Sequence, residues 1–169
     1  LDSNGHIYIT GHFQGTVDFD PSTGTANLFS IGGQDAFIAK YDTNGNYMWA
    51  KATEAVSGVL YSNAIALDSS DNVHITGNFV GTVDFDPSVA VANLASTGGQ
   101  DIFIAKYDTN GNYIWAKPIL GIDNIEDRAY SIALDGSGQV HITGYFYGIV
   151  DFDPSPASAN LISGGNQDI

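Results

Sequence analysis

The sequence lacks cysteine altogether and has few positive charges. Without cysteine there is no disulfide framework, no thiolate metal site and no thiol nucleophile. The chain has 19 acidic residues and a formal net charge of −14. Its cations are Lys40, Lys51, Lys106, Lys117 and Arg128. Binding to nucleic acid requires clustered cations, and no apolar run approaches the length of a membrane span. We therefore expect no nucleic-acid partner and no membrane span.

Glutamate is scarce as well. Among the acidic residues, Glu54 and Glu126 are the two glutamates, and all others are aspartate. Aspartate and the 20 glycines favour turns and are poor in helix interiors. Nine tyrosines and nine phenylalanines favour strands. With 43% hydrophobic residues in 169, the chain can bury a core. This composition predicts an all-β protein with tight turns.

The sequence repeats itself with a period of 66 to 67 residues. LDSNGHIYITGHFQGTVDFDP opens the chain and returns twice with small changes, and GGQDAFIAKYDTNGNYMWAK returns once. We divide the chain into repeat 1 at 1–66, which lacks its first strand, repeat 2 at 67–133, and a truncated repeat 3 at 134–169. Together they are expected to form one propeller-type domain fragment, part of a longer chain or a larger assembly. Two copies would supply unequal numbers of first and second strands, so we do not expect a dimer to close a regular five-bladed ring.

One complete unit is predicted to contain four short strands, at residues 62–68, 73–79, 102–107 and 113–119. The segment between the second and third strands is predicted to form a short hairpin or a long loop. Four short antiparallel strands per unit are typical of propeller blades. The predicted fold class is therefore all-β, with four-stranded antiparallel β-propeller blades in tandem. About two and a half repeats are present, which predicts a partial or open propeller.

Apolar residues occupy both faces of the third strand. Phe103 and Ile104 point to opposite faces because side chains alternate along a strand. Blades that stack face to face bury both, so Phe103, Ile104 and Trp115 are all predicted to be largely buried. The alternative is a string of separate small β-domains, in which one of the two faces would meet water.

The runs HITGxFxGxVDFDP and GGQDxFIAKYDTNGNYxWAK resemble a bacterial β-propeller repeat family, the SBBP-type repeats. The resemblance covers essentially the whole chain. It implies a propeller and a secreted or cell-surface location, and it does not imply an enzyme. A closed propeller has four to eight blades, more than these repeats supply.

The sharpest polar signal is a pair of aspartates in each DFDP run. The candidate metal ligands are Asp18, Asp20, Asp84, Asp86, Asp151 and Asp153. At a spacing of two residues in a strand, both carboxylates of a pair would share one face. Such a pair repels unless a cation, a donor or water intervenes. One interpretation is a Ca²⁺ site completed by backbone carbonyls. The other is that one aspartate caps a turn and its neighbour is solvated.

Other recurring polar residues are interpreted as structural. Asp35, Asp101 and Asp168 are predicted to bond a turn backbone, and the DTNGN segments to form plain hairpin turns. The histidines are expected at the surface or in strand packing. Each lysine is expected to pair with a nearby aspartate, with a lysine-lined anion channel as the alternative. Trp49 and Trp115 are expected between blades, with a sugar-stacking platform as the alternative.

No catalytic motif is present: there is no GxSxG nucleophile elbow, no HExxH and no phosphate-binding glycine loop. We therefore expect a non-catalytic, extracellular structural or adhesive module of a larger bacterial surface or secreted protein. It would make protein or glycan contacts and need no cofactor other than Ca²⁺. One alternative is a lectin-like propeller with exposed aromatics beside Asp and Asn. Another is a fragment of a secreted hydrolase, with non-repeating polar residues in a central funnel.

Overall fold

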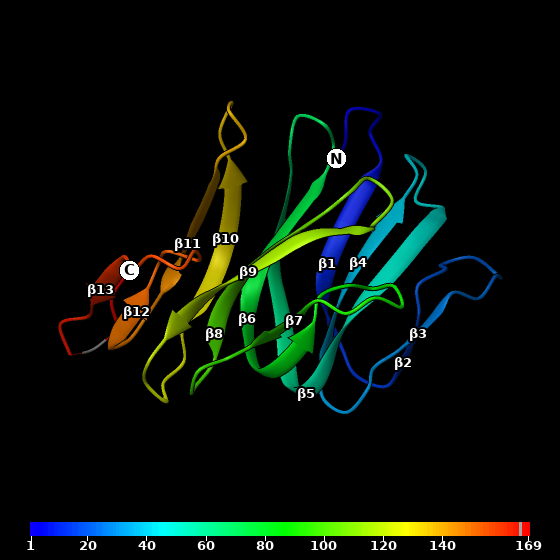
Figure 1. Ribbon diagram of the computed structural model, residues 1–169. Helices are drawn as coiled ribbons and strands as arrows, with labels where there is room; N and C mark the ends of the chain where they lie inside the picture. Colours follow the sequence, from blue (N-terminus) through cyan, green and yellow to red (C-terminus); the bar gives the residue numbers. More distant parts are fainter. Residues whose placement is uncertain (166) are drawn as a thin grey trace.

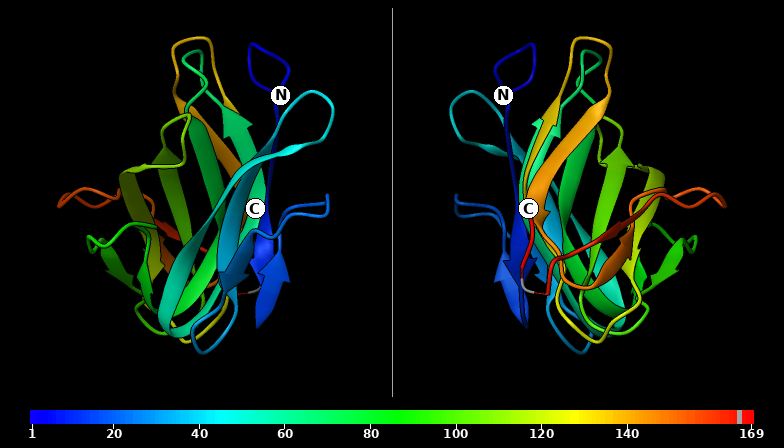
Figure 2. Two further views of the ribbon diagram at one scale, coloured as in Figure 1. Left: turned by 90° about the vertical axis from the view of Figure 1, so that its right-hand side faces the viewer. Right: turned by 90° about the vertical axis from the view of Figure 1, so that its left-hand side faces the viewer.

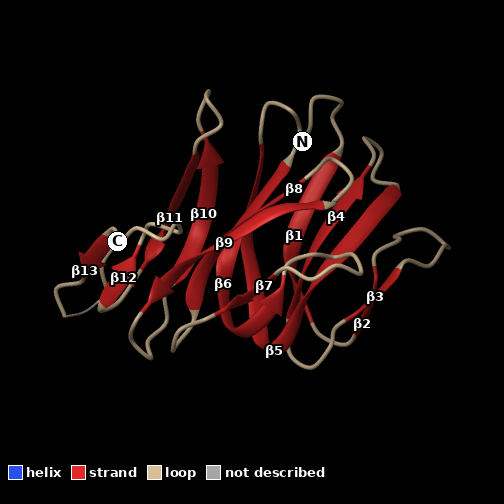
Figure 3. Ribbon diagram, in the orientation of Figure 1, coloured by secondary structure: helices blue, strands red, loops and turns tan. Residues whose placement is uncertain are grey.

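Antiparallel β-strands joined by tight turns account for the regular structure of this protein, seen in a computed structural model that describes residues 1–165 and 167–169 (Figure 1). The strands are β1 (Ile7–Phe13), β2 (Thr16–Asp18), β3 (Asn27–Phe29), β4 (Asp35–Tyr41), β5 (Tyr47–Leu67), β6 (Val73–Asp84), β7 (Asn93–Ala95), β8 (Asp101–Tyr107), β9 (Tyr113–Gly121), β10 (Arg128–Leu134), β11 (Val140–Tyr145), β12 (Ile149–Asp151) and β13 (Asn160–Ile162). The described residues include no helix (Figure 3). The all-β prediction is confirmed.

The middle unit, here called blade 2, contains the four predicted strands. It consists of residues 54–67 of β5, followed by β6, β8 and β9, each pairing antiparallel with the next. The strands extend a few residues beyond the predicted ranges. A bulge between Ser62 and Ala64 interrupts the β5–β6 ladder. One complete four-stranded antiparallel unit, flanked by partial units of the same kind, gives the chain a propeller-like fold.

Two partial units flank blade 2. Blade 1 consists of β1, β4 and residues 47–53 of β5. Blade 3 begins with β10 and β11, which pair with each other. The long strand β5 therefore belongs to two blades, first pairing with β4 and then with β6. The three units follow one another across Figure 1 from blue to red as an open array, and the described strands do not close a ring.

A short hairpin stands between the second and third strands of each unit. Its strands are β2 and β3 in blade 1, the end of β6 with β7 in blade 2, and β12 with β13 in blade 3. Thus the hairpin, rather than the long loop, is confirmed. Residues 150–151 of β12 also pair with the end of β9. The hairpin base of blade 3 thereby joins it to the last strand of blade 2.

Two apolar clusters lie between successive blades. The larger joins blade 1 to blade 2 and includes Ile38 and Phe103. The smaller joins blade 2 to blade 3 and includes Ile102 and Phe146. The two faces of β8 thus contact different neighbours, as stacked blades require. The turned views of Figure 2 show the sheets lying side by side.

Side chains at equivalent positions of the repeat are buried to different extents in different blades. Phe103 is fully buried, whereas Ile104 and Trp115 are only partly buried, so the predicted burial is complete for Phe103 and partial for the other two. Ile38, at the position in blade 1 that Ile104 has in blade 2, is 1% exposed because it is covered by a complete blade. The described part of blade 3 covers the corresponding face of blade 2 with only two long strands. The end of the array therefore stays partly open.

Candidate functional site

The paired aspartates of the DFDP runs cap turns. Oδ1 of Asp84 accepts the backbone N–H groups of Asp86 (3.0 Å) and Ala92 (2.8 Å), and Oδ1 of Asp86 accepts that of Ser88 (2.9 Å). The same three bonds recur in blades 1 and 3, where the donors are Asp20, Ala26, Ser22, Asp153, Ala159 and Ser155. The first aspartate of each pair ends a strand and the second lies beyond it. The pair therefore does not share one strand face, and both members bind the backbone of the same loop.

Calcium binding at these pairs stays a prediction. Among the described residues, no group of three or more His, Cys, Asp or Glu side chains is placed to hold a metal ion, so Ca²⁺ would need backbone carbonyls to complete its shell. If it binds, millimolar calcium should raise the melting temperature by mass action. The double variant Asp84→Asn and Asp86→Asn should lose part of that rise. If the melting curves with calcium and with chelator are identical, the calcium interpretation is wrong and turn capping alone explains the paired aspartates.

A second polar arrangement gathers at one end of the blades, which we call the rim. It surrounds the aspartate that opens each first hairpin turn: Asp2, Asp68 and Asp135. In blade 2, Oδ2 of Asp68 lies 2.8 Å from Nζ of Lys106 and 3.4 Å from Nε2 of His74. Oδ1 of the same carboxylate accepts the backbone N–H groups of Ser70 and Asn72. The carboxylate thus ties the turn to the third strand. The three turns lie together at the upper end of the molecule in Figures 1 and 2.

Blade 1 repeats this arrangement with different partners. Oδ2 of Asp2 lies 3.2 Å from Nζ of Lys40 and 2.8 Å from Nδ1 of His6. The Lys40 ammonium also sits over the Tyr8 ring, 4.8 Å from its centroid. In blade 3, Asp135 lies 3.6 Å from the exposed His141. The aspartate recurs in all three blades and its third-strand lysine partner recurs in blades 1 and 2, whereas the histidine partner of blade 1 comes from a different repeat position than those of blades 2 and 3.

Hydrogen bonds determine the charge state at the rim. Burial works to raise the pKa of Asp68, but the bonds from Lys106, Asn72 and Ser70 outweigh it and hold that pKa well below the usual range. For His74, burial lowers the pKa, and the bond to Asp68 opposes this only in part. Asp68 is therefore a stable anion whose main counterion is Lys106.

The rim aspartates were missed in the sequence. Each follows a leucine at the same position in its repeat, which would have been the signal. The lysines were predicted to pair with aspartate, and this is confirmed for Lys40 and Lys106. Lys51 and Lys117 form no ion pair in the part of the chain that the structure describes.

Asp35 and Asp101, which open the third strands of blades 1 and 2, are buried, whereas Asp168 at the same position in repeat 3 is partly exposed and accepts the N–H of Gly164. Oδ1 of Asp35 accepts the N–H of Ala55 and Oδ2 accepts that of Ile31, both at 2.8 Å. Asp101 accepts the N–H groups of Thr97 and Gly121 in the same way. The predicted bond to a turn backbone is confirmed, and it also reaches the strand that leads to the next blade.

Trp49 lies between blades as predicted. It packs against the cluster shared by blades 1 and 2, and its ring faces the Gly111 turn of blade 2. Trp115 is half-buried and makes an edge contact with His74. Neither ring forms an open platform of the kind that sugar stacking requires.

Asp127 is the buried carboxylate with the clearest dependence on pH. Burial raises its pKa to about 6, with Asp101 and Asp123 adding to the rise, against the bond from the Tyr147 N–H. The folded state thus keeps a proton that the unfolded state loses near pH 3.8. The resulting stabilisation is complete below that pH and disappears as the pH rises through 6. Asp127→Asn should therefore raise the melting temperature at pH 7.5 and have little effect at pH 4.

A matched variant should behave in the opposite way. Hydrogen bonds from Ser137 and Gln139 lower the pKa of Asp135 to about 2. Its stabilisation exists above pH 3.8 and disappears as the pH falls through 2. Asp135→Asn should thus lower the melting temperature at pH 7.5. If thermal scans show the same pH profile for both variants, the environment assigned to Asp127 is wrong.

No helix of the described residues is long and apolar enough to cross a membrane.

No protein-family model matches the chain. Over 98% of its length, the chain is 28% identical to an uncharacterized WD repeat-containing protein of Acanthamoeba polyphaga mimivirus. Over 80% of its length, it is 28% identical to the regulatory protein FlaEY of Caulobacter vibrioides. The matches span only 13% and 15% of those proteins. Similarity to a WD-repeat protein agrees with a repeat module that has a propeller-like fold.

Proposed function

We propose that this chain is a non-catalytic structural or adhesive β-propeller module of the SBBP type, carried outside the cell by a larger bacterial surface or secreted protein. The observation that supports this most directly is that the recurring polar groups bind other groups of the protein itself. The DFDP aspartates cap loops, the rim aspartates of blades 1 and 2 bind lysine and turn amides, and the third-strand aspartates bind a turn and the strand that leads to the next blade. The polar contacts that recur in the blades therefore stabilise the blades themselves.

Contacts with partners would be made by segments that differ between repeats. The clearest of these is the loop after β9, where Ile122 is 68% and Ile125 is 47% exposed. Val89 and Val91, in the hairpin of blade 2, are also exposed. Isolated exposed apolar residues are common on proteins, but here they lie on loops that a stacked scaffold holds in place. A rigid array with variable loops suits adhesion.

Two measurements test the proposal. Antibodies against this chain should label intact, unpermeabilised source cells, or their medium, if the module is extracellular. Beads coated with the chain should adhere to a protein or glycan surface, and the double variant Ile122→Ser and Ile125→Ser should reduce adhesion. Lys117→Ser, on the exposed side of β9, is a control that leaves the loop unchanged.

The rival functions give different results. Selective glycan-array binding that survives the loop variants would favour a lectin-like propeller. Substrate turnover by the purified chain would favour the hydrolase alternative. Label confined to the cytoplasm would refute the extracellular assignment.

A further inference from the structure

The fourth strands of blades 1 and 2 have a free outer edge. Among the residues that the structure describes, residues 47–53 of β5 pair only with β4, and residues 113–119 of β9 pair only with β8. A free edge presents unpaired N–H and C=O groups to which a strand of another chain can add. Beside the blade 1 edge lies a groove of about 400 Å³ whose lining includes Phe29, Ile31 and Ala52. This groove would receive apolar side chains of an added strand, so the edge favours association.

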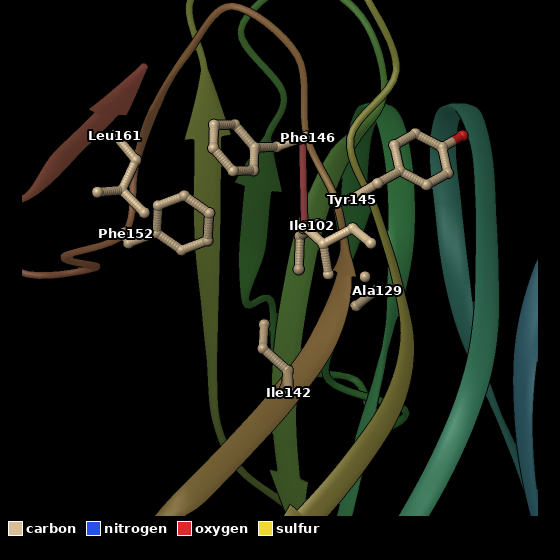
Figure 4. A pocket seen from close by; sticks show the side chains of 9 residues that line it. Ile102, Ala129, Ile142, Tyr145, Phe146, Phe152 and Leu161 are labelled. Atoms are coloured by element: carbon tan, nitrogen blue, oxygen red, sulfur yellow. The ribbon is translucent and has the colours of Figure 1, made fainter. Parts of the chain in front are cut away.

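Both edges lie inside the chain. The complete blade 2 follows residues 47–53, and blade 3 begins after β9, so the edges are not open because the sequence stops there. They differ in this from the apolar hollow that Ile102, Phe146 and Phe152 border in Figure 4, which lies where the sequence ends, as the third strand of repeat 3 begins. The free outer edge is therefore a property of the repeat itself.

A tyrosine hydroxyl occupies an amide in the middle of each edge. The N–H of Ala50 donates to Oη of Tyr47, and the N–H of Ala116 donates to Oη of Tyr113, each at 3.0 Å. An incoming antiparallel strand needs outward-facing N–H groups to pair, and an amide that donates to this hydroxyl is not available to it. Each fourth strand thus covers one donor of its own edge.

Neighbouring rings hold the two capping tyrosines in place. Tyr47 packs edge-on against Tyr41, and Tyr113 packs edge-on against Tyr107, with the ring centroids 6.3 Å apart in both blades. The hydroxyl of each third-strand tyrosine donates to a backbone carbonyl of the DFDP run of its blade, at 3.0 Å. The capping ring is therefore fixed by packing, and its hydroxyl is left to bind the edge amide.

Blade 2 protects its edge a second time. Pro118 follows Ala116 by two residues, so it lies on the same edge of the strand, and proline has no N–H to offer an added strand. The same position in blade 1 is Ala52, because Ala52 pairs with Phe37 as Pro118 pairs with Phe103. The edge of blade 1 lacks this proline and depends more on its tyrosine.

We propose that Tyr47 and Tyr113 cap the outer edges of the fourth strands and so prevent a second copy of this chain from adding its own fourth strand there. A second copy is the partner to exclude, because it carries the same edge and the same groove, and identical edges pair symmetrically. The inference goes beyond the proposed adhesive function, since it concerns contact between modules rather than contact with a partner surface.

Tyr47→Phe tests the cap because it removes the hydroxyl and keeps the ring against Tyr41. In dilute solution, the Ala50 amide should exchange with solvent about tenfold faster, the factor that one ordinary hydrogen bond provides. In concentrated solution, with about 0.5 M salt to screen the net charge of −14, the variant should sediment as a dimer or a larger species relative to the unchanged chain. Protection from exchange should then rise in residues 47–53.

Blade 2 supplies the matched controls. Tyr113→Phe should speed exchange at Ala116 by a similar factor and cause much less association, because Pro118 remains. Adding Ala52→Pro to Tyr47→Phe copies that proline into blade 1 and should restore the sedimentation of the unchanged chain.

Tyr41→Phe distinguishes the cap from a general loss of packing. It removes the hydroxyl that binds the DFDP run and leaves the cap on Ala50 in place, so it should cause no association. Unchanged exchange at Ala50 in Tyr47→Phe, or an unchanged sedimentation coefficient, would overturn the proposal. So would equal association of Tyr41→Phe, association that Ala52→Pro does not reverse, or new protection confined to β1 or β11.

Discussion

Phe103→Ala is expected to lower the free energy of unfolding by about 3–5 kcal/mol, the usual range for truncating a buried phenylalanine. The ring is fully buried and contacts both Phe79 and Phe85. It also belongs to the cluster that includes Ile38 of blade 1, so the loss should extend beyond its own blade. Denaturant unfolding measures the size of the effect, and hydrogen exchange measures its spread.

The control for this variant is Phe29→Ala, which removes the same ring from an exposed position. It should change stability by well under about 1 kcal/mol. Ile104→Ala should give a smaller loss than Phe103→Ala because Ile104 is half-buried. If protection falls only within 67–133 and the flanking blades keep theirs, the units are independent, and the packing between blades does not couple them.

Asp101→Ala is expected to have an effect of similar size for a different reason. Asp101 is 2% exposed, and its carboxylate accepts the N–H groups of Thr97 and Gly121, each at 2.7 Å. Removing the acceptor leaves two amides without partners, at about 1–3 kcal/mol each. The expected loss is therefore about 2–5 kcal/mol, read from the denaturation midpoint.

Two further variants distinguish lost hydrogen bonds from lost charge. Asp101→Asn keeps one oxygen acceptor, and should lose less than Asp101→Ala. Asp86→Ala removes a carboxylate whose partner is the N–H of Ser88 in an exposed turn, where water can replace it. It should change stability by less than about 1 kcal/mol. A loss at Asp86 equal to that at Asp101 would contradict this account and indicate a further role for the DFDP turn.

The sequence predicted the blade because its signals are local. Strand-forming apolar residues, turns rich in Asp, Asn and Gly, and a fixed period each identify strands and turns without knowledge of the fold. The bond from Asp101 to a turn backbone was also predicted, from its recurrence beside a Gly-Gly-Gln turn. The hairpin between the second and third strands stayed ambiguous, because its strands are three residues long and no periodicity can show in so few.

The sequence could not predict contacts between residues far apart in the chain, or the residue at which a strand ends. Asp68 meets Lys106 across 38 residues of chain, a distance at which spacing carries no information. Ile38 and Ile104 are the same residue type at the same repeat position, yet Ile38 is buried and Ile104 is half-buried. The difference arises because the described part of blade 3 covers Ile104 less completely than blade 2 covers Ile38. The pair Asp84 and Asp86 was expected on one strand face because β6 was assumed to continue through both, but the strand ends at Asp84.

The shared strand β5 affects how the molecule would carry a load. Its first third pairs with β4 and the remainder with β6, without a loop between the two parts. A loop at that junction would stretch first and let one blade separate from the next. A continuous strand passes tension directly from one ladder to the other, so the bonds on both sides are sheared together. Pulled from the ends of the chain, blades 1 and 2 should therefore yield together, whereas blade 3, which is joined to blade 2 through the loop between β9 and β10, should separate first.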